Sequence, residues 1–239
     1  MNKFYDKLDS WKKSFRSRKN YTTKDRHPFY EIAIPYLPNN KAEVIVDIGA
    51  GKGEFVNHLN LYAKYKNVFL LDANKHTIQY LKEKHSNAIL YRAPEKLPFE
   101  DSTVSFIHSS HMVEYLNHVE FYTFLKEIDR ILKDKGILMI SAPLLWEEFY
   151  YDLSHVRPYY PDVFTVYLCS EKGVQTREVI SKNYTIQKLI YRYTTIDSVD
   201  WGANSIIFDF IIQLLKKVLK NLGINKYKKN GFTLILQKN

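Results

Sequence analysis

Cysteine is almost absent from this sequence of 239 residues. Cys169 is the only one, so the chain can form no internal disulfide and offers no multi-cysteine metal site, and we expect a reducing compartment. Long apolar runs are also missing, because the most apolar stretch, 206–215, contains Asp209 and Gln213 and is too short to span a bilayer. Residues 1–18 are basic and polar and lack the apolar core of a signal peptide. These absences predict a cytoplasmic protein, or one bound peripherally to the inner membrane surface.

Acidic residues are scarce at both ends of the chain. Residues 1–26 hold nine Lys or Arg against three Asp, and residues 216–239 hold seven Lys and no acid. The body between them holds nineteen bases and twenty-three acids and is mildly acidic. Basic ends can bind nucleic acid, anionic lipid or a phosphorylated partner, or can serve only solubility. Nucleic acid is the less expected partner, because an enzyme acting on it would also carry positive charge along its cleft.

Overall composition is that of a globular protein. Hydrophobic residues make up 45% and charged residues 26%, which excludes a collagen-like, low-complexity or largely disordered chain. Between 43 and 142, short apolar runs alternate with helical patterns. Strands are expected at 43–48, 67–71, 88–91, 104–107 and 137–140, and helices at 54–65, 77–84 and 121–132. Such alternation predicts a parallel α/β sheet. Further strands are expected at 185–193 and 232–237, with a helix at 206–222 between them.

A glycine-rich turn joins the first expected strand to the first expected helix, and reads Asp47-Ile-Gly-Ala-Gly-Lys-Gly53. Glycines allow the backbone to turn sharply and to approach a ligand closely. The N-terminus of the following helix favours a polar or anionic group of that ligand. A nicotinamide-binding turn would need its third glycine at Glu54, and a P-loop would need Ser or Thr at Gly53. The acid at Asp47 suits a cationic or amino-acid-like ligand instead. Asp72 ends the second strand, at a distance from the turn where a carboxylate can accept both ribose hydroxyls.

Over roughly residues 43–143 these features resemble the class I S-adenosylmethionine-dependent methyltransferases. The turn at 47–53, Asp72, the Leu-Pro-Phe turn at 97–99 and the segment 132–136 occur in the order of that family. The resemblance implies an α/β fold: a doubly wound, mostly parallel, seven-stranded Rossmann-like sheet, with helices on both faces and an antiparallel last strand. Before this region, we expect a basic N-terminal helical extension at 1–40. The methyltransferase domain would then cover 41–239, with substrate-side insertions at 144–184 and 194–230.

S-adenosylmethionine is the cofactor that the resemblance implies. Asp47 would anchor its methionine part beside the glycines, and Asp72 would hold its ribose. The full set of expected cofactor-binding residues is Asp47, Gly49, Ala50, Gly51, Phe55, Asp72, Ala73, Glu95 and Ser109. The chain departs from the family where an Asp-Ala pair usually meets the adenine, because Ala93-Pro94 offers neither a carboxylate nor a second N–H. Either Glu95 supplies the polar contact, or apolar packing holds the adenine.

Two histidine-containing segments are the candidates for catalysis. His111 follows the fourth strand, where many relatives carry Ser-His-x-x-Glu-His and this chain ends the pattern with Tyr115. It can act as a general base or only cap the next helix. Residues 152–159 resemble an Asp-Pro-x-His-x-Arg-Pro-Tyr segment of a branch that includes many O-antigen and surface-glycan methyltransferases. His155 can accept a hydroxyl proton and Arg157 can bind phosphate or carboxylate, or both only tie this segment to the core.

The sequence thus predicts an S-adenosylmethionine-dependent methyltransferase that methylates an oxygen of a glycan, a nucleotide-linked sugar or a similar hydroxylated metabolite. Other interpretations stay open: a lipid or quinone-like substrate, RNA, or a cofactor-binding protein without catalysis. No tight acid–histidine cluster indicates a metal, and no Gly-x-Ser-x-Gly elbow indicates a hydrolase. The helix at 206–222, apolar with lysines at one end, fits peripheral membrane contact, a cover for the sheet or a homodimer interface.

Overall fold

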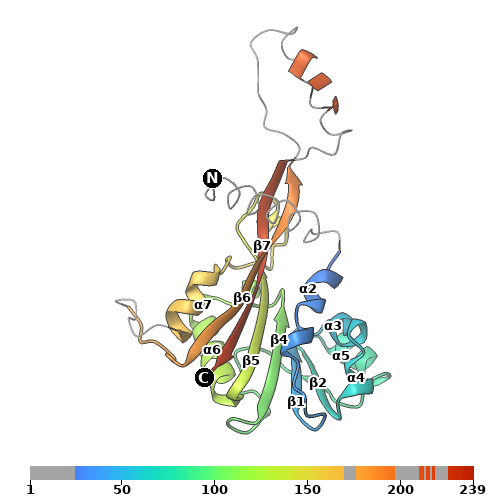
Figure 1. Cartoon of the computed structure of the whole chain (residues 1–239), viewed down its shortest axis with the longest axis vertical. Helices are drawn as coiled ribbons and strands as arrows, with labels where there is room; N and C mark the ends of the chain where they lie inside the picture. The colour runs from blue at the N-terminus through green and yellow to red at the C-terminus, as the bar shows by residue number, and fades with distance from the viewer. Residues whose placement is uncertain (1–24, 170–175, 197–209, 213, 216, 219–225) are drawn as a thin grey trace, which may run out of the picture.

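A seven-stranded sheet forms the centre of the computed structural model, which describes residues 25–169, 176–196, 210–212, 214–215, 217–218 and 226–239. The strand order is β3-β2-β1-β4-β5-β7-β6 (Figure 1). The strands are β1 (Val44–Ile48), β2 (Asn67–Asp72), β3 (Ala88–Leu90), β4 (Val104–Ser110), β5 (Leu132–Pro143), β6 (Tyr184–Ile196) and β7 (Lys226–Lys238). Strands β1 to β5 pair in parallel, and β7 is antiparallel to both of its neighbours. The predicted sheet, with its antiparallel last strand, is therefore confirmed.

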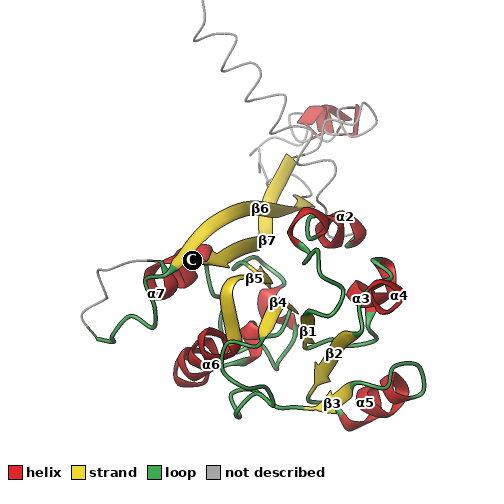
Figure 2. Cartoon of the chain, turned by 60° about the horizontal axis from the view of Figure 1, so that its bottom comes forward, coloured by secondary structure: helices red, strands yellow, loops and turns green. Residues whose placement is uncertain are grey.

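Helices cover both faces of the sheet (Figure 2). On one face, a buried apolar cluster includes side chains of α2 (His27–Glu31), α3 (Glu54–His58), α4 (Leu61–Lys64) and α5 (Lys75–Lys82). On the other face, a second cluster includes α6 (His118–Ile131) and α7 (Pro161–Leu168). Short 3-10 helices lie in the connections: η1 (Ile34–Tyr36), η2 (Val113–Tyr115) and η3 (Phe149–Tyr151). This two-sided cover explains why β1 and β4 consist almost wholly of buried residues.

Local signals decide where several elements begin and end. The Asn117 side chain accepts hydrogen bonds from the N–H groups of Val119 and Glu120, and the Glu120 carboxylate accepts from the Asn117 N–H at 2.8 Å. This capping box starts α6 at His118, three residues before the predicted start. The prediction of a single helix at 54–65 was wrong. The segment forms two helices, α3 and α4, because Asn60 between them adopts the left-handed region at φ +51°. Strand β5 begins at Leu132, earlier than predicted, and α7 was not predicted.

Parts of the predicted terminal and inserted segments lie outside the described residues. Of the extension predicted at 1–40, residues 1–24 are outside, and α2 and η1 are helical. Of the helix predicted at 206–222, residues 210–212, 214–215 and 217–218 are described and helical. Among the residues that the structure describes, none of the helices combines the length and apolarity needed to cross a lipid bilayer.

Candidate functional site

The glycine-rich turn lies at the carboxyl end of β1 and is fastened to β2. The N–H groups of Gly49 and Ala50 both donate to the Leu71 carbonyl, at 2.8 and 3.0 Å. Gly49 and Gly51 have φ values of +75° and +53°, in the left-handed region where glycine is favoured. A Cβ on Gly49 would meet the Met112 side chain at 3.0 Å, whereas one on Gly51 would meet nothing within 4 Å. The space beside Gly51 is therefore open to a ligand.

Asp72 lies next to this turn, as the sequence spacing predicted. Its Oδ2 accepts a hydrogen bond from the Gly51 N–H at 2.9 Å, and its Oδ1 accepts one from the Asn74 N–H at 2.8 Å. Both bonds hold the half-buried carboxylate in place, and each oxygen keeps a second lone pair for a ribose hydroxyl. Ala73, the next residue, is exposed. The structure thus brings the turn and the carboxylate together, and their role toward the cofactor stays a prediction.

Asp47 is held inside the protein by a histidine that sequence reasoning missed. The Asp47 carboxylate is buried on β1, and its Oδ1 lies 2.7 Å from Nδ1 of His108 on β4, the residue opposite it in the sheet. The ring of Phe55 stacks on the His108 ring at 3.8 Å between centroids. One oxygen of Asp47 is therefore occupied before any ligand binds, and Phe55 supports this pair. The only sequence signal for His108 was a polar residue within a buried strand.

Ser109 and Glu95, the other predicted cofactor contacts, differ in setting. Ser109 is buried on β4, and its Oγ has no hydrogen-bond partner among the described residues, so it is available to a ligand. Glu95 is exposed. The structure fastens its backbone instead, since its N–H donates to the Arg92 carbonyl at 3.0 Å and its carbonyl accepts from the Tyr91 hydroxyl at 2.9 Å. This leaves the Glu95 side chain free to turn toward an adenine.

His111 stands at the carboxyl end of β4 between an acid and a base. Its Nδ1 lies 3.1 Å from Oε1 of the buried Glu114, and its Nε2 accepts a hydrogen bond from Nη1 of Arg192 on β6. Burial lowers the pKa of His111, and the positive charge of Arg192 lowers it further. The hydrogen bond to Glu114 raises this pKa but does not outweigh them. A neutral imidazole fits both contacts, with the proton on Nδ1 donated to Glu114 and the lone pair on Nε2.

Arg192 is the most perturbed cation at this site. Burial lowers its pKa to about 10, and the nearby Arg26 adds to the effect. Its other guanidinium nitrogens donate to the side chain and the carbonyl of Asn230 on β7. A Cβ on Gly231 would meet the guanidinium at 2.7 Å, so glycine at this position makes room for it. Glu114 belongs to the same sequence pattern as His111, but no sequence motif pointed to Arg192 or Arg26, because they come from separate segments.

These groups border a small cavity at the carboxyl ends of β4 and β5. Its volume is about 20 Å³, room for about one water molecule. It is lined by Arg26, Phe29, Tyr30, Ser110, His111, Ser141, Arg192, Phe232 and Thr233. Most of its polar groups are hydroxyl or basic groups, which suits a polar acceptor. Arg26, the residue before α2, and Phe29 and Tyr30 of α2 form one wall of this cavity.

The second predicted catalytic segment docks beside the first. The N–H groups of Val156 and Arg157 donate to the Glu114 carbonyl at 2.9 and 3.3 Å. The His155 ring contacts the Tyr115 ring, and its Nδ1 donates to the Phe149 carbonyl at 2.6 Å. The Arg157 guanidinium is exposed and lies over a tyrosine ring outside the small cavity. Thus neither His155 nor Arg157 lines the cavity at His111, although both belong to the segment that braces it.

Metal-ligating side chains do not gather in this region. Across residues 25–169, 176–196 and the shorter described stretches, no group of three or more His, Cys, Asp or Glu side chains could hold a metal ion.

Comparison with known proteins finds similarities to the central part of the chain. Residues 46–140 match the methyltransferase domain family. YrhH of Bacillus subtilis is 25% identical over 173 residues, covering 65% of this chain and 92% of its own length. MJ0638 of Methanocaldococcus jannaschii is 31% identical over 133 residues, covering 52% of this chain and 54% of its own. MJ1252 of the same organism is 28% identical over 109 residues, covering 44% of this chain and 39% of its own. The chain thus spans about half or less of the length of the two archaeal relatives.

Solved structures show the same fold. A S-adenosylmethionine-dependent methyltransferase from Archaeoglobus fulgidus superposes with a TM-score of 0.58 at 18% identity, covering 90% of this chain and 95% of its own. TehB from Haemophilus influenzae superposes with a TM-score of 0.57 at 16% identity, covering 91% of this chain and 64% of its own. At such low identity these likenesses establish the fold of the chain.

Proposed function

We propose that this chain, which carries a class I S-adenosylmethionine-dependent methyltransferase domain, methylates a hydroxyl oxygen of a glycan, a nucleotide-linked sugar or a similar hydroxylated metabolite. The observation that carries the proposal is the His111–Glu114 pair at the carboxyl end of β4. In open α/β sheets, ligands bind at the carboxyl ends of the strands. A hydroxyl acceptor gains from a base that removes its proton, whereas a carboxylate or phosphate needs none. A half-buried histidine backed by a buried carboxylate therefore favours a hydroxyl.

The residues of the glycine turn fit S-adenosylmethionine. The open space beside Gly51 admits a ligand close to the backbone, and Asp72 offers carboxylate oxygens already oriented by two N–H groups. The unpartnered Oγ of Ser109 adds a buried polar group at the same sheet edge. When bound, the cofactor supplies a methyl group that is already activated for displacement. The protein then has to align the acceptor and exclude water.

His111 would receive the acceptor's proton at Nε2. Glu114 fixes the tautomer by accepting the Nδ1 proton, and the lowered pKa keeps the imidazole neutral near pH 7. Because Arg192 donates to Nε2 in this structure, the acceptor hydroxyl has to replace that contact. The released guanidinium would then lie beside the acceptor, where it can bind an anionic group such as the phosphate of a nucleotide-linked sugar. This would give the half-buried Arg192 a role toward the acceptor.

Methyl-labelled cofactor tests the proposal against separate pools of nucleotide-linked sugars, glycans, lipids and RNA. We expect label in a sugar-containing pool, and a loss of turnover in His111→Gln of about a hundredfold or more, the usual contribution of a general base. Cofactor affinity should stay the same, because His111 lies beyond the glycine turn. The matched control is His76→Gln, at an exposed histidine of α5. Label only in RNA or lipid, or full turnover in His111→Gln, would contradict the proposal.

A lipid-carried acceptor is a second candidate, favoured by the described part of the segment between β6 and β7. Five of its apolar side chains are 46–70% exposed: Phe210, Ile211, Leu214, Leu215 and Val218. An exposed apolar face beside basic residues is typical of a helix that lies in a membrane interface. We expect the full chain to float with anionic vesicles at low salt, and Phe210→Asp to weaken this binding. Leu153→Asp, at an equally apolar exposed position, is the control.

The same helix offers a homodimer interface as the alternative occupant of that face. Sedimentation velocity of the full chain without vesicles distinguishes the two. A dimer that Phe210→Asp converts to a monomer, together with no vesicle binding, would assign the face to a second copy of the chain.

A further inference from the structure

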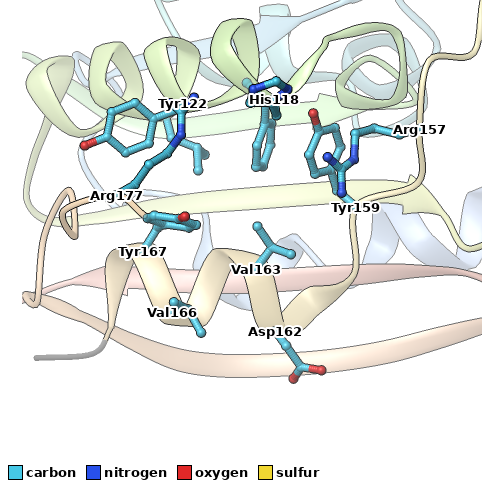
Figure 3. A pocket seen from close by; sticks show the side chains of 11 residues that line it. His118, Tyr122, Arg157, Tyr159, Asp162, Val163, Val166, Tyr167 and Arg177 are labelled. Carbon is cyan, nitrogen blue, oxygen red and sulfur yellow. The ribbon is translucent and has the colours of Figure 1, made fainter. Parts of the chain in front are cut away.

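A second and much larger cavity lies between α6 and α7, on the sheet face opposite α3 and α5 (Figure 3). We call it the α6–α7 cavity. Its volume is about 330 Å³, and it is lined by His118, Phe121, Tyr122, Leu125, Arg157, Tyr159, Asp162, Val163, Val166, Tyr167 and Arg177. None of these residues lines the small cavity at His111. Its size falls within the range of small-molecule binding sites.

Aromatic rings form the walls of the α6–α7 cavity and are fixed in place. Phe121 stacks on Tyr159 with 3.9 Å between ring centroids, and Tyr122 meets Tyr167 edge-on at 5.7 Å. The Tyr159 hydroxyl donates to the Leu116 carbonyl at 2.9 Å. The Tyr159 hydroxyl is thus bonded to backbone, and the ring contributes its carbon atoms to the cavity lining. Flat apolar molecules bind such walls by stacking.

Two arginines approach the cavity from opposite ends, as Figure 3 shows. The Arg177 guanidinium lies 5.0 Å above the Tyr122 ring, and the Arg157 guanidinium lies 5.2 Å above the Tyr159 ring. Neither has a carboxylate partner among the described residues. The Asp162 carboxylate points away from the rings. The cavity therefore combines an apolar middle with positive charge at its ends, and within the described part of the chain no carboxylate pairs with that charge.

We propose that the α6–α7 cavity is a binding site for a flat, largely apolar molecule that carries an anionic group, a sulfonate, carboxylate or phosphate ester. The rings would hold the apolar body, and the planar guanidinium groups would bind the anion through paired N–H groups. Arg157, which does not line the cavity at His111, would bind the anionic group here. This binding is independent of which acceptor the enzyme methylates.

Anilinonaphthalene sulfonate is the probe, since it has a flat apolar body and one anionic group and fluoresces when bound. Phenylnaphthylamine has the same rings without the sulfonate and serves as the neutral probe. We expect one saturable site for the sulfonate on the full chain, and about tenfold weaker binding of the neutral probe, the effect of losing about 1.4 kcal/mol of charge-assisted contact. Saturating S-adenosylmethionine should leave the sulfonate bound, because the two sites share no residue.

Variants locate the bound probe. Arg157→Gln and Arg177→Gln should each weaken binding of the sulfonate probe severalfold and leave binding of the neutral probe unchanged. Val166→Trp should fill the cavity and remove both, with Val163→Phe as a second filling variant if the first does not fold. Lys82→Gln, at an exposed lysine of α5, is the matched charge control. Each variant must keep its stabilisation by S-adenosylmethionine, which confirms folding. The proposal would be overturned if the filling variants and both arginine variants still bound the sulfonate probe as wild type does. It would also be overturned if S-adenosylmethionine displaced that probe.

Discussion

Replacing Gly51 by alanine separates strain in the glycine turn from contact with the cofactor. Gly51 and Gly53 both have positive φ, +53° and +75°. An alanine in this left-handed region costs roughly 1–2 kcal/mol, partly offset by about 0.4–1 kcal/mol because the unfolded chain loses freedom. Each variant should therefore lose about 1 kcal/mol of folding free energy, which lowers the melting temperature by about 2–4 °C for a chain of this size.

The two alanines differ in what their methyl groups meet. At Gly51 the Cβ meets nothing within 4 Å, so it intrudes only on the space assigned to the cofactor. At Gly53 the Cβ meets Asn57 and Leu81 at 3.4 Å and Leu70 at 3.7 Å, inside the protein. Gly53→Ala is thus a matched control with the same kind of strain and no cofactor contact.

The assay is thermal unfolding with and without S-adenosylmethionine, supported by calorimetric titration. At a concentration about a hundredfold above the dissociation constant, the cofactor should stabilise wild type and Gly53→Ala by about 2.7 kcal/mol. Gly51→Ala should lose most of this stabilisation. If Gly51→Ala binds the cofactor as wild type does, or if both variants lose it equally, the placement of the cofactor beside Gly51 is wrong.

Three further outcomes follow from the described contacts. Asp72→Ala should lose most of the thermal stabilisation by the cofactor, and unchanged stabilisation would exclude Asp72 from the ribose site. His108→Phe should lower the free energy of unfolding in urea by about 3–5 kcal/mol, because it leaves the Asp47 carboxylate buried without its partner; a loss below about 1 kcal/mol would contradict a buried charge there. The rate of methyl transfer should fall as the pH drops below the lowered pKa of His111, because protonation removes the base, and a profile that His111→Gln leaves unchanged would exclude this role.

The parallel half of the fold could be predicted because each buried strand reads as a continuous apolar run that ends in a turn signal. Prediction was weaker where exposed residues continue a strand. Lys133, Asp134 and Lys135 are polar and largely exposed, yet they belong to β5. Likewise β7 begins before the turn-like pair Asn230-Gly231, which lies inside the strand to receive the Arg192 side chain. Such pairing depends on a partner strand far away in the sequence.

In the candidate site too, features set by local sequence could be predicted, and contacts between distant segments could not. The glycine turn and Asp72 belong to a local pattern with fixed spacing, and the structure brings them into contact. His108 and Arg192 carry no such pattern, because each acquires its partner only through the strand order of the sheet. The segment at 152–159 was found by resemblance, and its packing against Glu114 requires the folded chain.

The most direct test of the account is the chemistry of the methylated product. The full chain is incubated with methyl-labelled S-adenosylmethionine and the pools of nucleotide-linked sugars and glycans, and the labelled product is treated with mild alkali. A hydroxyl acceptor yields a methyl ether, so the account predicts label that remains on the sugar after alkali and that depends on His111. Label released as methanol would reveal an ester formed on a carboxylate, and no transfer by a protein that binds the cofactor would indicate binding without catalysis; either result would contradict the account.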